Sequence, residues 1–194
     1  MKTTVEIKSF KKRTIAVPIR GISPLVVHAF SEKARTIIID KQGGKAKNAK
    51  HEIRNPEEEY TASKHISSQG WEGFPASGFK AAIIRGAKMI GLVMKDTQGG
   101  LFVKEDDPVT QLVKIEGVSK MRTDMVRVGM GSADVRYRAE YTDWSAVLNI
   151  EFNEGVISVD QIYQIVMAGG YGCGIGEMRP EKGKFNYGRW ELDV

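Results

Sequence analysis

The stretch that decides the fold runs from Ser158 to Trp190, SVDQIYQIVMAGGYGCGIGEMRPEKGKFNYGRW. Ser158 followed three residues later by Gln161 is a capping-box pattern, and apolar residues recur behind it at helical spacing. Gly169 is placed to end this helix in the left-handed conformation. A loop rich in glycine follows, and a final strand is expected around 185–192. The stretch therefore predicts a helix, a glycine-rich loop and a strand.

The elements before this stretch follow from hydrophobic periodicity. Alternating apolar residues predict a strand at 13–21, where Pro18 indicates an edge position or a bulge. A short helix is expected after Ser31, and Ser77 can cap a longer helix that reaches about Ile90. Short strands are expected at 100–104, 111–117 and 124–129, and the two clearest strands at 133–141 and 144–152.

This order of elements predicts an α+β fold. The 194 residues are within the range of one domain, so we expect a single domain over 1–194. An antiparallel sheet with helices on one face fits best, in the split βαβ arrangement of ferredoxin-like proteins. Residues 41–72 are poor in apolar side chains, and we expect them to form a long polar insertion.

Charge and cysteine content narrow the function classes. The chain has 29 Lys and Arg against 24 Asp and Glu, a net charge of +5, which favours a polyanionic partner. The single cysteine excludes an intramolecular disulfide and a cysteine-based zinc site. The N-terminus lacks an apolar signal-peptide core, and the longest uncharged run is interrupted by glycines. We therefore expect a cytoplasmic protein with no membrane partner.

The glycine-rich loop allows two interpretations. Seven glycines lie between residues 169 and 188, and such a loop can expose backbone N–H groups to phosphate oxygens. The basic side chains of Arg179 and Lys182 lie in the same loop and favour this interpretation. The alternative is structural, a helix cap followed by a tight turn into the last strand.

Two segments resemble the signatures of one family. The segment FPASGFKAAIIRGA begins a predicted helix, and GGYGCGIGEMRPEKGKFNYG follows the last predicted helix. Together they resemble the RAMP superfamily, the RNA-binding proteins of CRISPR effector complexes. The first segment matches the family pattern at Pro75, Ser77, Lys80 and Arg85, and the second at Gly172, Gly174, Gly176 and Arg179.

The resemblance implies a modified RRM or ferredoxin-like core and a binding mode. Related backbone subunits polymerise along a guide RNA and grip it mainly through its phosphates. The implied partners are single-stranded RNA, or single-stranded DNA in a phage or mobile-element relative, further copies in an oligomer or filament, and other effector subunits. The insertion would be thumb-like, although its charge run is equally typical of a solvated loop. The candidate contacts are Lys45, Lys47, Lys50, Ser77, Lys80, Arg85, Gly172, Gly174, Gly176, Arg179 and Lys182.

Two other functions remain open. Ribonucleases of the same superfamily often use a histidine near the first helix, and His28 lies about there; it is a candidate general base for cleavage by an adjacent 2′-hydroxyl. A lone histidine beside PLVV is also typical of a buried structural residue. A basic surface that binds an acidic protein is the third possibility. No metal or cofactor is expected, because the histidines and acidic residues lack ligand spacing.

Overall fold

A computed structural model describes residues 9–29, 36, 39–40, 42–43, 54–128 and 132–193. Most of the short helix expected after Ser31 and much of the expected insertion lie outside these residues; residues 36, 39–40 and 42, which are described, are helical. The named strands are β1 (Lys12–Gly21), β2 (Leu25–Val27), β3 (His65–Ile66), β4 (Glu72–Pro75), β5 (Leu101–Lys104), β6 (Leu112–Lys114), β7 (Glu116–Val128), β8 (Ser132–Asn153) and β9 (Trp190–Leu192). The helices are α2 (Pro56–Ala62), α3 (Ala76–Met89), α4 (Met94–Gly100) and α5 (Val159–Gly172), with the 3₁₀ turn η1 (Pro180–Lys182).

The main sheet is antiparallel and ferredoxin-like. β8 pairs with β1 along one edge and with β5 along the other, and β9 pairs with the free edge of β1. The connection from β1 through α3 to β5 therefore skips over β8, which is the split βαβ arrangement. The connection from β8 through α5 to β9 likewise skips over β1. The expected α+β, ferredoxin-like fold is confirmed.

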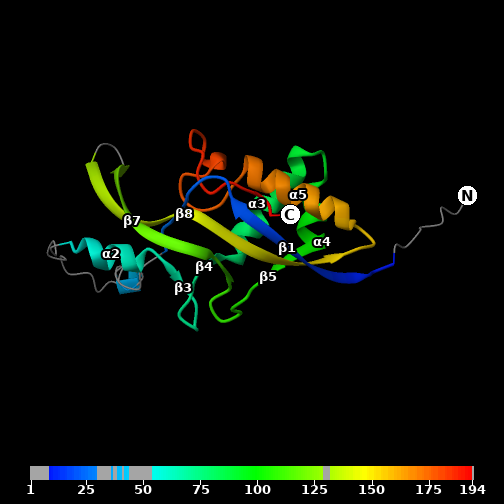
Figure 1. Cartoon of the computed structure of the whole chain (residues 1–194), viewed down its shortest axis with the longest axis horizontal. Coiled ribbons are helices and arrows are strands. Elements are labelled where there is room, and N and C mark those ends of the chain that lie inside the picture. The colour runs from blue at the N-terminus through cyan, green and yellow to red at the C-terminus, as the bar shows by residue number, and fades with distance from the viewer. Residues whose placement is uncertain are drawn as a thin grey trace, which may run out of the picture.

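The strand β8 is the longest element, with 22 residues. The sequence predicted two strands here, at 133–141 and 144–152, but the chain continues through both without a turn. The half of β8 before Ser145 pairs with β7 and β2, and the half after it pairs with β1 and β5. We call the hairpin of β7 with the first half of β8 the arm. Figure 1 shows β8 running from the arm to the part of the sheet that the helices cover.

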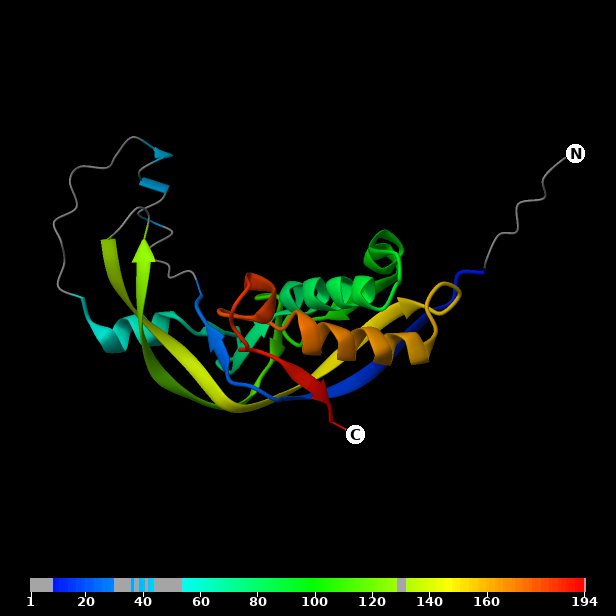
Figure 2. The ribbon, with the colours of Figure 1, turned by 90° about the horizontal axis from the view of Figure 1, so that it is seen from above.

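Helices α3 and α5 cover one face of the sheet, as Figure 2 shows. They bury a shared core that includes Phe79, Ile83, Ile162 and Ile165, all of which have no exposed area. The two helices approach so closely that a Cβ at Gly86 would clash with the backbone of Gly169. The capping box of Ser158 and Gln161 is confirmed at the start of α5.

Two predicted helix ends are wrong. Gly169 does not end α5, which continues to Gly172. Gly169 instead allows the close contact with α3, and the left-handed residue after the helix is Gly174, with φ +66°. Ser77 does not cap α3. Strand β4 runs directly into this helix at Pro75, and the N–H of Ala76 donates to the carbonyl of Gln111 at 3.0 Å instead.

Pro18 lies in β1, which pairs with β8 in unbroken register from Lys12 to Arg20, so no bulge occurs there. On its other side β1 pairs with β9 only from Ile19 to Gly21, so within the described residues Pro18 lies at the edge of this pairing, as the sequence predicted. Proline is tolerated because the N–H of Asp193, just past the end of β9, donates to the Pro18 carbonyl at 3.0 Å. Pro18 therefore lies where pairing with β9 stops, and its missing donor leaves no gap in the ladder.

Residues 54–72 of the expected polar insertion are described and form regular elements. Asn55 accepts hydrogen bonds from the N–H groups of Glu57 and Glu58 and caps α2. The Tyr60 hydroxyl lies 3.0 Å from the carbonyl of Ser119, which fixes α2 against β7. A second sheet of order β3-β4-β6 follows and leads into α3. The acidic segment Pro56–Tyr60 thus contacts its own sheet.

Candidate nucleic-acid interface

A cleft of about 190 Å³ lies between α3 and the loop that follows α5. Gly78, Ala81, Ala82 and Arg85 form its helical wall, because residues at this spacing share one face of a helix. Three of the four are small, so the wall leaves room beside the sheet. Polar groups from three other segments enter the cleft, and they are His28, His65, Glu177 and Arg179.

The two histidines come together although they are far apart in sequence. His28 follows β2 and His65 begins β3. Burial lowers the pKa of His28, and the positive charges of Arg138 and Arg136 lower it further. Burial also lowers the pKa of His65, with a smaller contribution from His28. Because both pKa values fall below 6.5, both imidazoles are mainly neutral at pH 7.

Two buried nitrogens near the cleft lack a partner among the described residues, His28 Nδ1 and Arg138 Nε. Arg138 is only 8% exposed, and its Nη1 donates to Asp124 Oδ2 at 3.3 Å. Buried polar groups in native proteins are nearly always hydrogen-bonded, to protein or to water. The described residues therefore leave the hydrogen-bonding capacity of both nitrogens unused, as at sites where buried water bonds to such groups.

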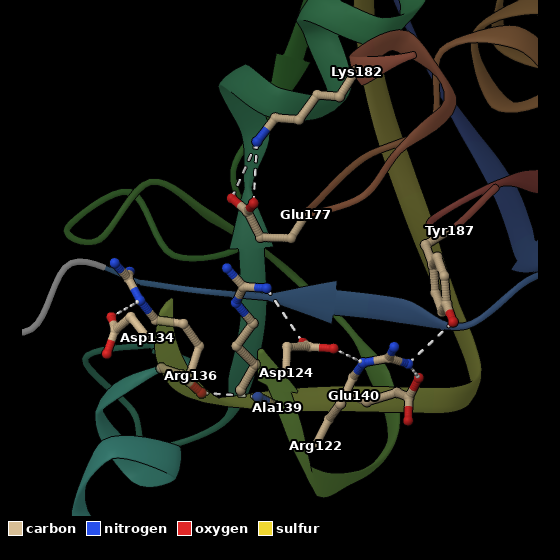
Figure 3. A network of polar contacts seen from close by, with 11 residues as sticks. Arg122, Asp124, Asp134, Arg136, Ala139, Glu140, Glu177, Lys182 and Tyr187 are labelled. Atoms are coloured by element: carbon tan, nitrogen blue, oxygen red, sulfur yellow. Dashed lines mark hydrogen bonds and ion pairs between the residues drawn. The ribbon is translucent and has the colours of Figure 1, made fainter. Parts of the chain in front are cut away.

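A chain of ion pairs covers the adjoining face of the arm (Figure 3). Arg122 contacts Asp124 at 2.8 Å and Glu140 at 2.7 Å, and its Nη1 donates to the Tyr187 hydroxyl at 3.1 Å. Arg136 contacts Asp134 at 2.9 Å. The contact with Tyr187 joins the arm to the segment that precedes β9.

A second group of charges joins α3 to the loop that follows α5. Arg85 Nη1 is 2.6 Å from Glu181 Oε1, and Arg179 Nε is 2.9 Å from Glu181 Oε2. Lys182 Nζ is 3.1 Å from Glu177 Oε2. Arg179 and Lys182 of this loop are thus neutralised locally by carboxylates.

The glycines of the loop make room for the protein's own backbone. Gly176 has φ +74°, and a Cβ there would clash with the carbonyl of Val26. Gly188 has φ +65°, and a Cβ there would clash with the carbonyl of Ile175. The N–H of Glu177 donates to the Val26 carbonyl at 2.7 Å, and the N–H of Ile175 donates to the Gly188 carbonyl at 2.9 Å. These amides are not free for phosphate, so the contact that requires glycine lies within the chain, as the structural interpretation expects.

The structure brings four of the predicted nucleic-acid contacts to one cleft, Arg85, Gly174, Gly176 and Arg179, together with the candidate general base His28. The others lie elsewhere. Lys80 is not among the lining residues; its Nζ lies 4.0 Å from the ring centroid of Phe102 on β5. Ser77 is exposed on the first turn of α3, and Gly172 ends α5, where a Cβ would meet the Met89 side chain. Lys182 lies in η1 beside the cleft.

The predicted contacts Lys45, Lys47 and Lys50 lie outside the described residues. His65, Glu181 and the buried Arg138 belong to the site, yet sequence reasoning did not select them for it. His65 lies in a polar segment with a two-residue strand, and no spacing relates it to His28. For Arg138, the strand alternation equally predicts a solvent-facing side chain.

Within the part of the chain that the structure describes, no three His, Cys, Asp or Glu side chains are placed to hold a metal ion. Nor does any helix in the described ranges have both the length and the apolar character that crossing a membrane requires.

The strand order and the two covering helices define the chain as a ferredoxin-like α+β protein. No protein-family model matches this chain, and no curated protein matches it significantly. Among solved structures, the chain is similar to the crystal structure of Cmr6 from Pyrococcus furiosus. The identity is 11%, the TM-score is 0.42, and the match covers 95% of this chain and 100% of that chain.

Proposed function

We propose that this protein is a non-catalytic, RAMP-like protein that binds single-stranded nucleic acid through its phosphates and oligomerises along the strand. The ligand is a guide-like RNA in this proposal, with single-stranded DNA as the competing ligand of the same chemistry. Further copies of the chain and other effector subunits are the proposed partners.

The observation that carries the proposal is the meeting of basic groups at one cleft. Arg85 comes from α3 and Arg179 from the C-terminal loop, and both are residues that the RAMP resemblance selects. The buried Arg138 adds an unpartnered donor near the same place. Guanidinium groups are suited to phosphate oxygens, because they offer several donors in a planar fork. The ferredoxin-like fold is also the one that the resemblance implies.

The proposal is tested by measuring binding of labelled 30-nucleotide RNA and DNA, single- and double-stranded, by fluorescence anisotropy across a salt series. We expect single strands to bind, with a log–log slope near −0.7 for each phosphate contacted. Arg85→Gln and Arg179→Gln should each reduce the slope by about 0.7 and weaken all sequences alike.

The matched control is Arg20→Gln, because Arg20 also pairs with a carboxylate, that of Glu191 at 2.6 Å, but does not line the cleft. Binding that is independent of salt, or equal losses in all three variants, contradicts the proposal. Electron microscopy with and without the strand tests oligomerisation, since a strand-dependent filament is the expected result.

The two neighbouring histidines favour ribonuclease activity as a second candidate. Neutral His28 and His65 at pH 7 fit a pair in which one accepts the proton of a 2′-hydroxyl. Incubation of a stem-loop RNA with the protein in EDTA decides between the two functions. Cleavage that is lost in His28→Ala and in His65→Ala supports the enzyme, and intact RNA excludes it.

A further inference from the structure

The carboxylate of Glu181 lies between the guanidinium groups of two cleft arginines. Each of its oxygens is within 2.6 Å of Arg85 Nη1, and Oε2 is also 2.9 Å from Arg179 Nε. Arg85 belongs to α3, and Arg179 directly precedes η1, the turn that carries Glu181. Two arginines from separate segments therefore share one anion.

The Glu181 carboxylate accepts hydrogen bonds here in the way that a phosphodiester of a nucleic-acid strand would. A carboxylate and a phosphate both accept paired hydrogen bonds from guanidinium groups, and such charge-assisted bonds are the strong ones. Both arginines line the cleft, whereas Glu181 lies at its border and is not among the lining residues. The Glu181 side chain is 25% exposed, so solvent and a ligand can reach it.

The turn that carries Glu181 is weakly attached. The N–H of Glu181 donates to the Cys173 carbonyl at 3.4 Å, at the long end of hydrogen-bond distances. Gly183, which ends the turn, has φ +112° and no heavy atom near the position of a Cβ. Moving this turn disturbs little packing, unlike moving Gly176 or Gly188, which are wedged against neighbouring backbone.

We propose that Glu181 occupies a phosphate site in the unbound protein and that a strand phosphate displaces it from Arg85 and Arg179. The inference rests on the proposed function and adds a regulatory residue to it. Glu181 competes with the ligand and so lowers the affinity for every polyanion. The alternative is that Glu181 only stabilises the fold, in which case its removal lowers stability and leaves affinity unchanged.

The test compares Glu181→Gln with Glu191→Gln. Both substitutions raise the net charge by one and remove a carboxylate that contacts an arginine at 2.6 Å. Glu181 also contacts Arg179, whereas Glu191 pairs with Arg20 away from the cleft. We expect E181Q to bind single-stranded RNA about three- to tenfold more tightly than the wild type, with a salt slope about 0.7 steeper, as for one added phosphate contact. E191Q should change affinity less than twofold.

The triple variant R85Q/R179Q/E181Q tests whether the gain acts through the two arginines. The gain of E181Q should disappear in the R85Q/R179Q background, because interacting residues are not additive. Equal gains in E181Q and E191Q, or a gain that persists without both arginines, overturn the inference.

Inorganic pyrophosphate provides a second measurement that needs no nucleic acid. A ligand that binds the folded state raises Tm by mass action. Pyrophosphate should raise the Tm of E181Q more than that of the wild type or E191Q, and this comparison remains valid if E181Q starts from a lower Tm. An equal rise in all three overturns the inference.

The two failures can be told apart. If the wild type binds RNA and depends on Arg85 and Arg179 but E181Q gains nothing, only this inference is wrong. If no variant binds RNA or DNA at low salt, the proposed function is wrong and the role of Glu181 as its regulator falls with it.

Discussion

The two halves of β8 are made of the same backbone ladder but are stabilised differently. In the half under the helices, Leu148 and Ile150 are fully buried and Phe152 is 2% exposed. In the arm half, Asp134 and Arg136 pair with each other, and Arg138 contacts Asp124 across the hairpin. The helix-covered half is therefore held by apolar burial. In the arm half, the outer part before Ala139 is held mainly by ion pairs, whereas Ala139, Tyr141 and Trp144 near the junction are buried in the core.

The difference shows where this fold can carry function. Each Å² of apolar surface that is removed from water stabilises the folded state by about 25 cal/mol, so the apolar side chains of the helix-covered half are a main source of stability. Exposed or half-exposed ion pairs contribute little, so the arm half and the neighbouring loop can exchange their partners for a ligand at small loss. Arg138 of the candidate site lies in the arm half and Arg179 and Glu181 lie in the neighbouring loop, where rearrangement costs little, whereas Arg85 reaches Glu181 from α3.

The largest effect is expected in the helix-covered half. Leu148→Ala removes a fully buried side chain and should lower the free energy of unfolding by about 2–5 kcal/mol. Val147→Ala is the matched control, because Val147 is the next residue in the strand, faces the other way and is 48% exposed. Urea unfolding measures both. Similar losses in the two variants would contradict the division of β8 by burial.

Much of this half could be predicted from the sequence. The alternation of Leu148, Ile150 and Phe152 indicated one buried face, and the capping box fixed the start of α5. The continuity of β8 could not be predicted, since residues between the two patterns look like a turn when the partners β1, β2 and β7 are unknown. Gly169 was misplaced because a glycine at a helix contact and a glycine at a helix end have the same sequence signal.

The candidate site was predictable only in part. The motif resemblance selected Arg85, Gly176 and Arg179, and the fold brings them to one cleft. The role of the glycines in packing against their own backbone required knowing that Val26 lies beside Gly176. His65 reaches His28 through the pairing of short strands, a tertiary effect that no local pattern records.

The junction between the two regions should give an intermediate effect. Glu72 accepts hydrogen bonds from Lys64 Nζ at 2.8 Å and from the Tyr141 hydroxyl at 2.6 Å. Glu72→Gln should lower the free energy of unfolding by about 1–3 kcal/mol at pH 7, because hydrogen bonds to a charged group are lost in a partly buried place.

The same substitution predicts a pH dependence. Burial opposes ionisation of Glu72, but the hydrogen bonds from Lys64 and Tyr141 outweigh it and lower its pKa from the usual 4.5. A lowered folded-state pKa gives stability that is present above pH 4.5 and is lost as the pH falls through the folded value. The difference between wild type and E72Q should therefore narrow below pH 4.5.

The control for Glu72 is Glu116→Gln, since Glu116 pairs with Lys114 at 2.7 Å on the surface, where its side chain is 64% exposed. This variant should match the wild type in urea unfolding at pH 7. A gap between wild type and E72Q that stays constant from pH 7 to pH 3 would show that the carboxylate charge is not responsible.

The smallest effect is expected in the arm. Asp134 Oδ2 accepts from Arg136 at 2.9 Å and Oδ1 from Arg54 at 2.5 Å, but its side chain is 31% exposed. Asp134→Asn should therefore lower the free energy of unfolding by less than about 1 kcal/mol. The loss should shrink between 0.05 and 1 M salt, because salt screens exposed charges, whereas the loss in Leu148→Ala should persist. A salt-independent loss as large as that of Leu148→Ala would mean that the arm is held by packing, and the contrast between the two halves of β8 would then not hold.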